Sequence, residues 1–117
     1  MISVAMTTYN GEKYVKEQLE SILEQTKPVD EIVIMDDKST DETVEIIKKI
    51  QEKSEVKIIL EVNKENVGYI ENFRRAIKKT KGDIIFLCDQ DDVWYKGKVE
   101  VMSELMEILV FYAQNMI

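Results

Sequence analysis

The sequence lacks histidine altogether and has a single cysteine, Cys88, among its 117 residues. The absence of histidine excludes a Ser-His-Asp triad, a histidine general base and a histidine metal ligand. One cysteine can form neither an intrachain disulfide nor a cysteine zinc cluster. The chemistry that remains is that of carboxylates, and carboxylates beside phosphates are typical ligands of a hard divalent cation.

Basic residues and long apolar runs are also scarce. There are 16 Lys and Arg against 23 Asp and Glu, so the net charge is −7, which disfavours binding to nucleic acid. The longest apolar run, residues 108–113, is too short to span a bilayer, and the start of the chain has no basic segment of the signal-peptide kind. The sequence therefore predicts a cytoplasmic protein in which residues 1–117 form one domain.

Four short runs rich in Ile and Val predict buried β-strands. The runs are residues 2–6, 31–35, 56–61 and 83–88. Between and after them, apolar residues recur every three or four positions, which predicts helices packed on the sheet. These stripes are Tyr14, Val15, Leu19, Ile22 and Leu23; Val44, Ile47 and Ile50; Ile70, Phe73 and Ile77; and Val99, Met102, Met106, Leu109 and Ala113. The alternation predicts an α/β fold with a mainly parallel sheet and helices on both faces.

Small polar or acidic residues follow every predicted strand, at the edge where parallel sheets bind ligands. Tyr9 either stacks on a base or covers the end of the sheet. Asp41 is explained as the start of a helix, whereas the position of Asp37 directly after a buried strand favours a functional role. Trp94 either anchors the last helix or walls a pocket, and anchoring is the favoured interpretation.

The sharpest acidic cluster consists of Asp89, Asp91 and Asp92. Three carboxylates within four residues repel one another, and a bound Mg²⁺ or Mn²⁺ would remove the conflict. The alternative is a solvated turn in which Asp92 caps the next helix. The spacing alone leaves both interpretations open.

Four segments resemble motifs of the family 2 glycosyltransferases, in the same order along the chain. Residues 4–10 (VAMTTYN) resemble the opening strand and T-Y-N turn, residues 31–41 (EIVIMDDKSTD) the D-D-x-S-x-D motif, residues 63–72 (NKENVGYIEN) the N-x-G-x-x-x-N segment, and residues 81–92 (KGDIIFLCDQDD) the strand leading into the D-x-D motif. Residues 18–26 also resemble the family's S-I-L-x-Q-T helix end. The resemblance covers about residues 1–101 and leaves 102–117 as an unassigned helix.

The resemblance implies the GT-A fold, a Rossmann-like three-layer α/β/α arrangement, and a nucleotide-diphosphate sugar donor linked to UDP or dTDP. By the family's pattern, the nucleotide-binding residues are Thr7, Tyr9, Asp37 and Asp89. Asp91, together with Asp89, would ligate Mn²⁺ or Mg²⁺. Thr8, Asn66 and Asp92 are further candidates for the same site. The resemblance also implies an inverting transfer to a glycan or lipid-linked acceptor in surface-polysaccharide synthesis, at the inner face of the membrane.

Three departures from the family's pattern stand out. Lys38 occupies a position where the family often has Gly, and Lys96-Gly97-Lys98 stands where a Pro is common. The family's members also continue well past this length, so the chain is predicted to be truncated. Inversion needs a base to deprotonate the acceptor hydroxyl, and no residue here matches one. Glu104 and Glu107 are predicted to be solvated.

Two other functions compete with that of a transferase. One is a noncatalytic nucleotide- and metal-binding fragment that needs a partner. The other is a signalling receiver domain, which would need an acidic pair after the first strand and a phosphoacceptor Asp after the third. Here those strands are followed by Thr-Thr-Tyr-Asn and by Asn63-Lys64-Glu65. An incomplete sheet with an exposed edge favours self-association, so a homo-oligomer is expected.

Overall fold

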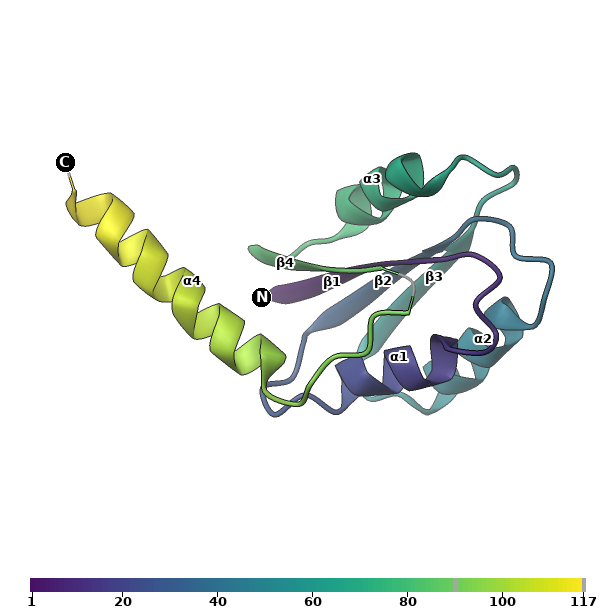
Figure 1. Ribbon diagram of the computed structural model, residues 1–117, viewed down its shortest axis with the longest axis horizontal. Coiled ribbons are helices and arrows are strands. Elements are labelled where there is room, and N and C mark those ends of the chain that lie inside the picture. The colour runs from purple at the N-terminus through teal and green to yellow at the C-terminus, as the bar shows by residue number, and fades with distance from the viewer. Residues whose placement is uncertain (90, 117) are drawn as a thin grey trace.

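The computed structural model describes residues 1–89 and 91–116, and these form a four-stranded parallel sheet in the order β3-β2-β1-β4 (Figure 1). The strands are β1 (Ile2–Thr8), β2 (Glu31–Asp36), β3 (Lys57–Val62) and β4 (Ile84–Cys88). The helices are α1 (Val15–Leu23), α2 (Thr43–Lys53), α3 (Tyr69–Lys79) and α4 (Lys98–Asn115). A helix follows each strand, so the predicted α/β fold is confirmed. Because the strands are parallel, their carboxyl ends lie at one edge of the sheet.

Helices cover both faces of this sheet, with α1 and α2 on one side and α3 on the other (Figure 1). The larger core lies beneath α1 and α2, where Val4 and Ile32 of the strands pack with Leu19 and Ile47. The smaller core lies beneath α3 and consists of Ala5, Val33, Met35 and Ala76, with Ile59 packed against them. Since the central strands β1 and β2 have a helix layer on each side, all of their residues are buried.

The edge strands β3 and β4 are less buried than their apolar sequences predict. α3 lies over β1 and β2, which leaves Ile85 and Leu87 of β4 exposed on that face. The strand limits also differ from the predicted ones by one or two residues. Sequence pattern identifies an apolar run, but the position of a strand at the edge of a sheet depends on its neighbours.

Two predicted core stripes are wrong. On α3, Ile70 and Ile77 are exposed, and the buried residues are Asn72 and Ala76. Small or polar residues suit this face because it packs closely on the small core, and Asn72 Nδ2 donates a hydrogen bond of 2.8 Å to the Met35 carbonyl. On α4, Val99 is buried as predicted, whereas the rest of the predicted stripe, Met102, Met106, Leu109 and Ala113, is exposed.

α4 extends away from the rest of the molecule, with its C-terminal end far from the sheet (Figure 1). The radius of gyration is accordingly 14.9 Å, against about 13.4 Å for a compact domain of this length. Val99 and Ser103, both near its start, are the buried residues described on this helix. None of the helices in the described part of the chain is long and apolar enough to cross a membrane.

A buried polar contact joins the centre of the sheet to the start of β4. The fully buried Glu31 carboxylate accepts hydrogen bonds from Ser3 Oγ and from the Lys81 N–H, both at 2.6 Å. Ser3 Oγ in turn accepts one from the Gly82 N–H at 2.8 Å. An added Cβ on Gly82 would overlap Ser3 Oγ and lie 2.7 Å from the Met1 carbonyl oxygen. The glycine is therefore needed for the close approach of these two segments.

Cys88, at the end of β4, is expected to be unreactive in the folded protein. Burial raises the pKa of its thiol from 9.0 to about 12, so the nucleophilic thiolate is scarce at neutral pH. Labelling by a disulfide reagent such as DTNB should therefore be slow in native buffer and rapid in denaturant. Fast stoichiometric labelling of the native chain would contradict this expectation.

The same pKa difference makes folding stability depend on pH. Between about pH 9 and pH 12 the unfolded chain loses the thiol proton while the folded chain keeps it, so stability falls as pH rises. At pH 10 this effect lowers the free energy of unfolding by about 1 kcal/mol relative to neutral pH. A Cys88→Ala variant is the control, because its stability should fall less steeply over this pH range.

Candidate functional site

A cleft of about 490 Å³ opens at the carboxyl edge of the sheet. Its lining comes from the ends of β1, β2 and β4 and from the start of α3. The lining residues are Thr7, Thr8, Tyr9, Asp37, Asn66, Gly68, Tyr69, Asn72 and Asp89. Six of these were candidates from the sequence, so the fold brings together residues as far apart in the chain as Thr7 and Asp89.

Asp36 and Asp37 are adjacent in the sequence, and the structure gives them different tasks. Asp36 is fully buried and holds the loop after β2, because its Oδ1 accepts hydrogen bonds from Thr8 Oγ1 at 2.7 Å and Ser39 Oγ at 2.6 Å. Lys38, inside this loop, has a φ of 60°. That left-handed conformation is the one that glycine adopts most readily, so Lys38 holds a backbone conformation that is costly for a residue with a side chain.

Asp37 fixes the loop that precedes α3. Its Oδ1 accepts hydrogen bonds from Asn63 Nδ2 at 3.0 Å and the Val67 N–H at 2.8 Å, and its Oδ2 accepts one from the Gly68 N–H at 3.1 Å. Asn66 Nδ2 also donates to the Asp37 carbonyl oxygen. Gly68 has a φ of 83°, which favours glycine at this turn. One buried carboxylate thus shapes the wall of the cleft.

Asn63 and Asn72 support Asp37 from behind. Asn63 Nδ2 donates to Asn72 Oδ1 at 2.8 Å as well as to Asp37, and Asn63 Oδ1 accepts from Arg75 at 3.2 Å. Because Arg75 donates to the Asn63 oxygen, the Asn63 amide directs its nitrogen at the Asp37 carboxylate. The orientation of Asp37 therefore depends on Asn63 and Arg75, which do not line the cleft.

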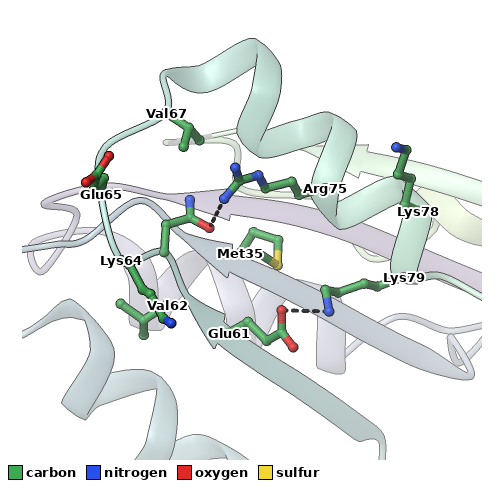
Figure 2. Close-up of a pocket in the computed structure, with 10 residues that line it drawn as sticks. Met35, Glu61, Val62, Lys64, Glu65, Val67, Arg75, Lys78 and Lys79 are labelled. Carbon is green, nitrogen blue, oxygen red and sulfur yellow. Dashed lines mark hydrogen bonds and ion pairs between the residues drawn. The ribbon is translucent and has the colours of Figure 1, made fainter.

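A second hollow, of about 770 Å³, lies between β3 and α3 (Figure 2). It is larger than the cleft and lined in part by Lys64, Arg75, Lys78 and Lys79. Lys79 reaches across to Glu61, with an Nζ–Oε2 distance of 2.7 Å (Figure 2). Lysines in the last turn of α3 also complement the helix dipole. The cations of this hollow are thus largely explained by local structure, and no site candidate from the sequence lines it.

The three carboxylates after β4 are spread over different surroundings. Asp89 lines the cleft, and with Asp92 it also lines an adjoining hollow of about 390 Å³. Asp91 is exposed, has a φ of 66° and lies outside the described lining of the cleft. Trp94 Nε1 donates to Asp92 Oδ2 at 3.4 Å. Asp92 does not cap α4, because that helix begins at Lys98.

The donor chemistry of this segment fits a hard divalent cation, since it consists of carboxylate oxygens. Across residues 1–89 and 91–116, however, no three His, Cys, Asp or Glu side chains lie close enough together to hold a metal ion. Gln90, the middle residue of the predicted D-x-D motif, lies outside the described residues, as does Ile117 at the end of the predicted domain. Asp89 and Asp91 therefore stay predicted ligands.

Trp94 anchors the segment before α4, in line with the favoured interpretation. Its ring is buried and packs on Phe86 with 5.7 Å between ring centroids, and Lys98 Nζ lies 4.6 Å above it. Its backbone N–H donates to Ser21 Oγ at 3.0 Å, which ties the segment to α1.

Three lining residues, Gly68, Tyr69 and Asn72, were not among the sequence candidates. Gly68 and Asn72 belong to the N-x-G-x-x-x-N segment, so the motif was the signal that could have identified them. Tyr69 carried no such signal, because its place in the lining depends on where α3 starts. Its ring, exposed at the mouth, packs edge-on against Phe73 at 5.9 Å.

The chain matches a known family model over residues 3–111, that of glycosyl transferase family 2. Among curated proteins it is 44% identical over 116 residues to the dTDP-rhamnosyl transferase RfbG of Shigella flexneri. That alignment covers 94% of this chain and 38% of RfbG. The chain thus spans about two-fifths of that relative's length.

Solved structures with the same fold carry nucleotides. The crystal structure of residues 1–349 of S. aureus TarS in complex with UDP-GlcNAc is 30% identical, with a TM-score of 0.82 over 91% of this chain and 31% of that one. The mannosyltransferase PcManGT of Pyrobaculum calidifontis, in complex with GDP-Man and Mn²⁺, is 29% identical, with a TM-score of 0.75 over 80% of this chain and 28% of that one.

Proposed function

The chain belongs to glycosyl transferase family 2, and we propose on that basis that its cleft binds the nucleotide diphosphate of a sugar donor. The observation that carries the proposal is the convergence of Thr7, Tyr9, Asp37 and Asp89 on one cleft at the carboxyl edge of the sheet. Relatives of similar fold hold UDP-GlcNAc and GDP-Man. The donor proposed here is linked to UDP or dTDP, since the RfbG relative is a dTDP-rhamnosyl transferase.

Each side chain has a role that its position supports. The Tyr9 ring is half exposed at the mouth of the cleft, where it can stack on the base. Among the described residues, Asp37 Oδ2 accepts one hydrogen bond, from the Gly68 N–H, and so retains a lone pair for a donor group of the base. Thr7, Thr8 and Asn66 also line the cleft, where they would lie beside the nucleotide.

The proposed cofactor is Mn²⁺ or Mg²⁺, held by Asp91 and Asp89, with Asp92 as a further candidate. One or two carboxylates with substrate phosphates are a usual ligand set for Mg²⁺, so a site completed by the diphosphate fits residues that do not form a three-carboxylate cluster by themselves. When bound, the cation would neutralise charge on the departing diphosphate.

The proposed reaction is an inverting transfer. The acceptor hydroxyl oxygen forms a bond to the anomeric carbon while the bond to the diphosphate breaks, the diphosphate leaves with the electron pair, and a base takes the hydroxyl proton. That base is not assigned to any residue of this chain. The proposed acceptor is a glycan or lipid-linked sugar of a surface polysaccharide, and the proposed location is the cytoplasm, at the inner face of the membrane. TarS, a poly(ribitol-phosphate) beta-N-acetylglucosaminyltransferase, supports a polymer as the class of acceptor.

Calorimetric titration of UDP and dTDP, with and without Mn²⁺, tests the donor site. We expect binding that needs the metal and that weakens at least tenfold in Asp91→Ala, a loss of about 1.4 kcal/mol. The control is Glu52→Ala, which removes an exposed carboxylate of α2 on the opposite side of the sheet from α3. Equal affinity in wild type and Asp91→Ala would remove Asp91 from the site. No binding of either nucleotide would overturn the proposal.

A noncatalytic nucleotide- and metal-binding role is the second candidate. The observation that favours it is that no residue in the described part of the chain is assigned as the base that an inverting transfer needs. Binding without release of the sugar from its nucleotide, in a coupled assay with water or a glycan as acceptor, would support this candidate over the transferase.

A further inference from the structure

Polar side chains from α1 and the residues after it hold the segment that carries the three carboxylates. This segment joins the end of β4 to the start of α4, and the structure describes its residues 89 and 91–97. The described part is neither helix nor strand, so its buried backbone groups need hydrogen-bond partners from elsewhere. Residues 18–26, the S-I-L-x-Q-T helix end, supply several of them, and the proposed donor site leaves this motif without a role.

Gln18 holds the first part of the segment. Its Nε2 donates hydrogen bonds to the Asp89 carbonyl oxygen and, at 3.2 Å, to Cys88 Sγ. The Cys88 thiol in turn donates to the Asp92 carbonyl oxygen at 3.6 Å. The Asp92 N–H donates to the Asp89 carbonyl oxygen at 3.2 Å, which closes a turn that contains Asp91. Gln18 therefore contacts one end of this turn directly and the other end through Cys88.

Ser21 and Gln25 hold the second part of the segment. Ser21 Oγ accepts the Trp94 N–H at 3.0 Å, and Gln25 Nε2 donates to the Tyr95 carbonyl oxygen at 2.8 Å. Gln25 Oε1 accepts the Val99 N–H at 2.9 Å. This N–H belongs to the first turn of α4, where backbone N–H groups have no partner within the helix. One amide side chain thus caps α4 and fixes the residues before it.

These contacts do more than fill space. Gln18 and Gln25 are 2% and 6% exposed, and an amide is unfavourable in such a place unless its hydrogen bonds are made. An apolar side chain would fill the same volume without that requirement. Asp91 has a φ of 66°, a conformation that persists where the surrounding structure fixes it. The hydrogen bonds from Gln18 therefore keep closed a turn that repulsion between its carboxylates would open.

We propose that Gln18, Ser21 and Gln25 are positioning residues for the divalent cation, an inference that rests on the proposed donor site. They hold the backbone of the acidic segment at the cleft before the cation and the diphosphate arrive, so binding does not have to order it. Partners that orient metal ligands contribute about tenfold or more to metal affinity. The glutamines of this motif thus act on the cation through Asp89 and its neighbours, without touching the cation.

Hydrogen exchange in the metal-free protein is the first test, with Gln18→Met and a matched control, Gln51→Met. Methionine keeps most of the side chain's volume and removes the amide. Gln51 Nε2 also donates to a backbone carbonyl, that of Ile58 at 2.7 Å, but this contact joins α2 to β3. We expect the Asp92 amide to exchange about fivefold faster in Gln18→Met and at the wild-type rate in Gln51→Met.

Titration of Mn²⁺ at saturating UDP or dTDP, followed by the electron paramagnetic resonance signal of free Mn²⁺, is the second test. We expect Mn²⁺ to bind about tenfold more weakly to Gln18→Met and within about twofold of the wild type to Gln51→Met. A merely structural role would lower the urea midpoint and leave the Mn²⁺ affinity of the folded protein unchanged. If Gln18→Met does not fold, Ser21→Ala takes its place, with an expected weakening of about threefold.

The outcomes separate this inference from the proposed function. A wild type that binds Mn²⁺ with nucleotide, and a folded variant of the motif that binds it equally well, would overturn the inference and leave the donor site standing. Equal weakening in Gln18→Met and Gln51→Met would also overturn it, because the loss would then be general. A wild type that binds neither nucleotide with Mn²⁺ would overturn the proposed function and this inference together.

Discussion

Gly82→Ala is expected to lower the free energy of unfolding by about 3 kcal/mol. The new methyl group would overlap Ser3 Oγ and approach the Ser3 nitrogen to 2.9 Å, and both belong to the central strand β1. Relief requires the segment before β4 to move away, which breaks the 2.8 Å hydrogen bond from the Gly82 N–H to Ser3 Oγ. Ser3 Oγ would then lose its donor inside the protein, close to the buried Glu31 carboxylate.

Urea denaturation followed by circular dichroism measures this loss, and Gly97→Ala is the matched control. A Cβ on Gly97 would meet its nearest atom, on Tyr95, at 4.0 Å, and the residue has an ordinary negative φ of −93°. Gly97→Ala should therefore change the free energy of unfolding by about 0.5 kcal/mol or less, as is usual for substitutions at uncrowded surface positions. Similar stabilities for the two variants would show that the segment before β4 yields without cost.

Asp37→Ala is expected to cost about 3 kcal/mol and to abolish nucleotide binding at the cleft. The substitution leaves the Val67 and Gly68 N–H groups and the Asn63 amide without their common acceptor. Hydrogen bonds to an ionised group are worth more than neutral ones, and here one carboxylate receives three. With the loop before α3 released, the wall of the cleft loses its shape as well as its charge.

Hydrogen exchange at the Val67 and Gly68 amides reports this change directly. Both amides should exchange at least tenfold faster in Asp37→Ala, because their hydrogen bonds end on that carboxylate. Asp37→Asn keeps one oxygen acceptor, so its amide exchange rates should lie between those of the wild type and Asp37→Ala. The control is Glu65→Ala, which removes an exposed carboxylate of the same loop. Unchanged exchange in Asp37→Ala would mean that the loop is held by other contacts.

Much of the fold could be predicted because its signals are local. The apolar runs of β1 and β2 identify strands buried on both faces, and polar residues at the ends of parallel strands must meet at one edge of the sheet. This is why Thr7, Asp37 and Asp89 could be placed in one cleft before any geometry was known. Motif order added the family, which composition alone does not indicate.

The features that escaped prediction depend on neighbours. The periodicity of α4 shows that the helix has apolar sides, but it does not tell which of them the domain covers, so Met102 and Leu109 were assigned to a core that they do not join. On α3, the close approach to Ala5 and Val33 selects Ala76 and Asn72 for the buried face in place of isoleucine. The different roles of Asp36 and Asp37 likewise follow from their hydrogen-bond partners, which the spacing of residues in the sequence does not predict.

The central place of β1 also has a consequence for how the chain folds as it is synthesised. Ser3 pairs with Glu31, and Glu31 pairs with Lys57, so three strands can assemble from the first part of the chain to leave the ribosome. The other edge of β1 must wait for β4, because Ile2 pairs with Ile84. During that interval an apolar strand edge is open to pairing with other nascent chains. Slow translation between residues 62 and 84 would prolong the interval, and rapid translation there would protect the chain from aggregation.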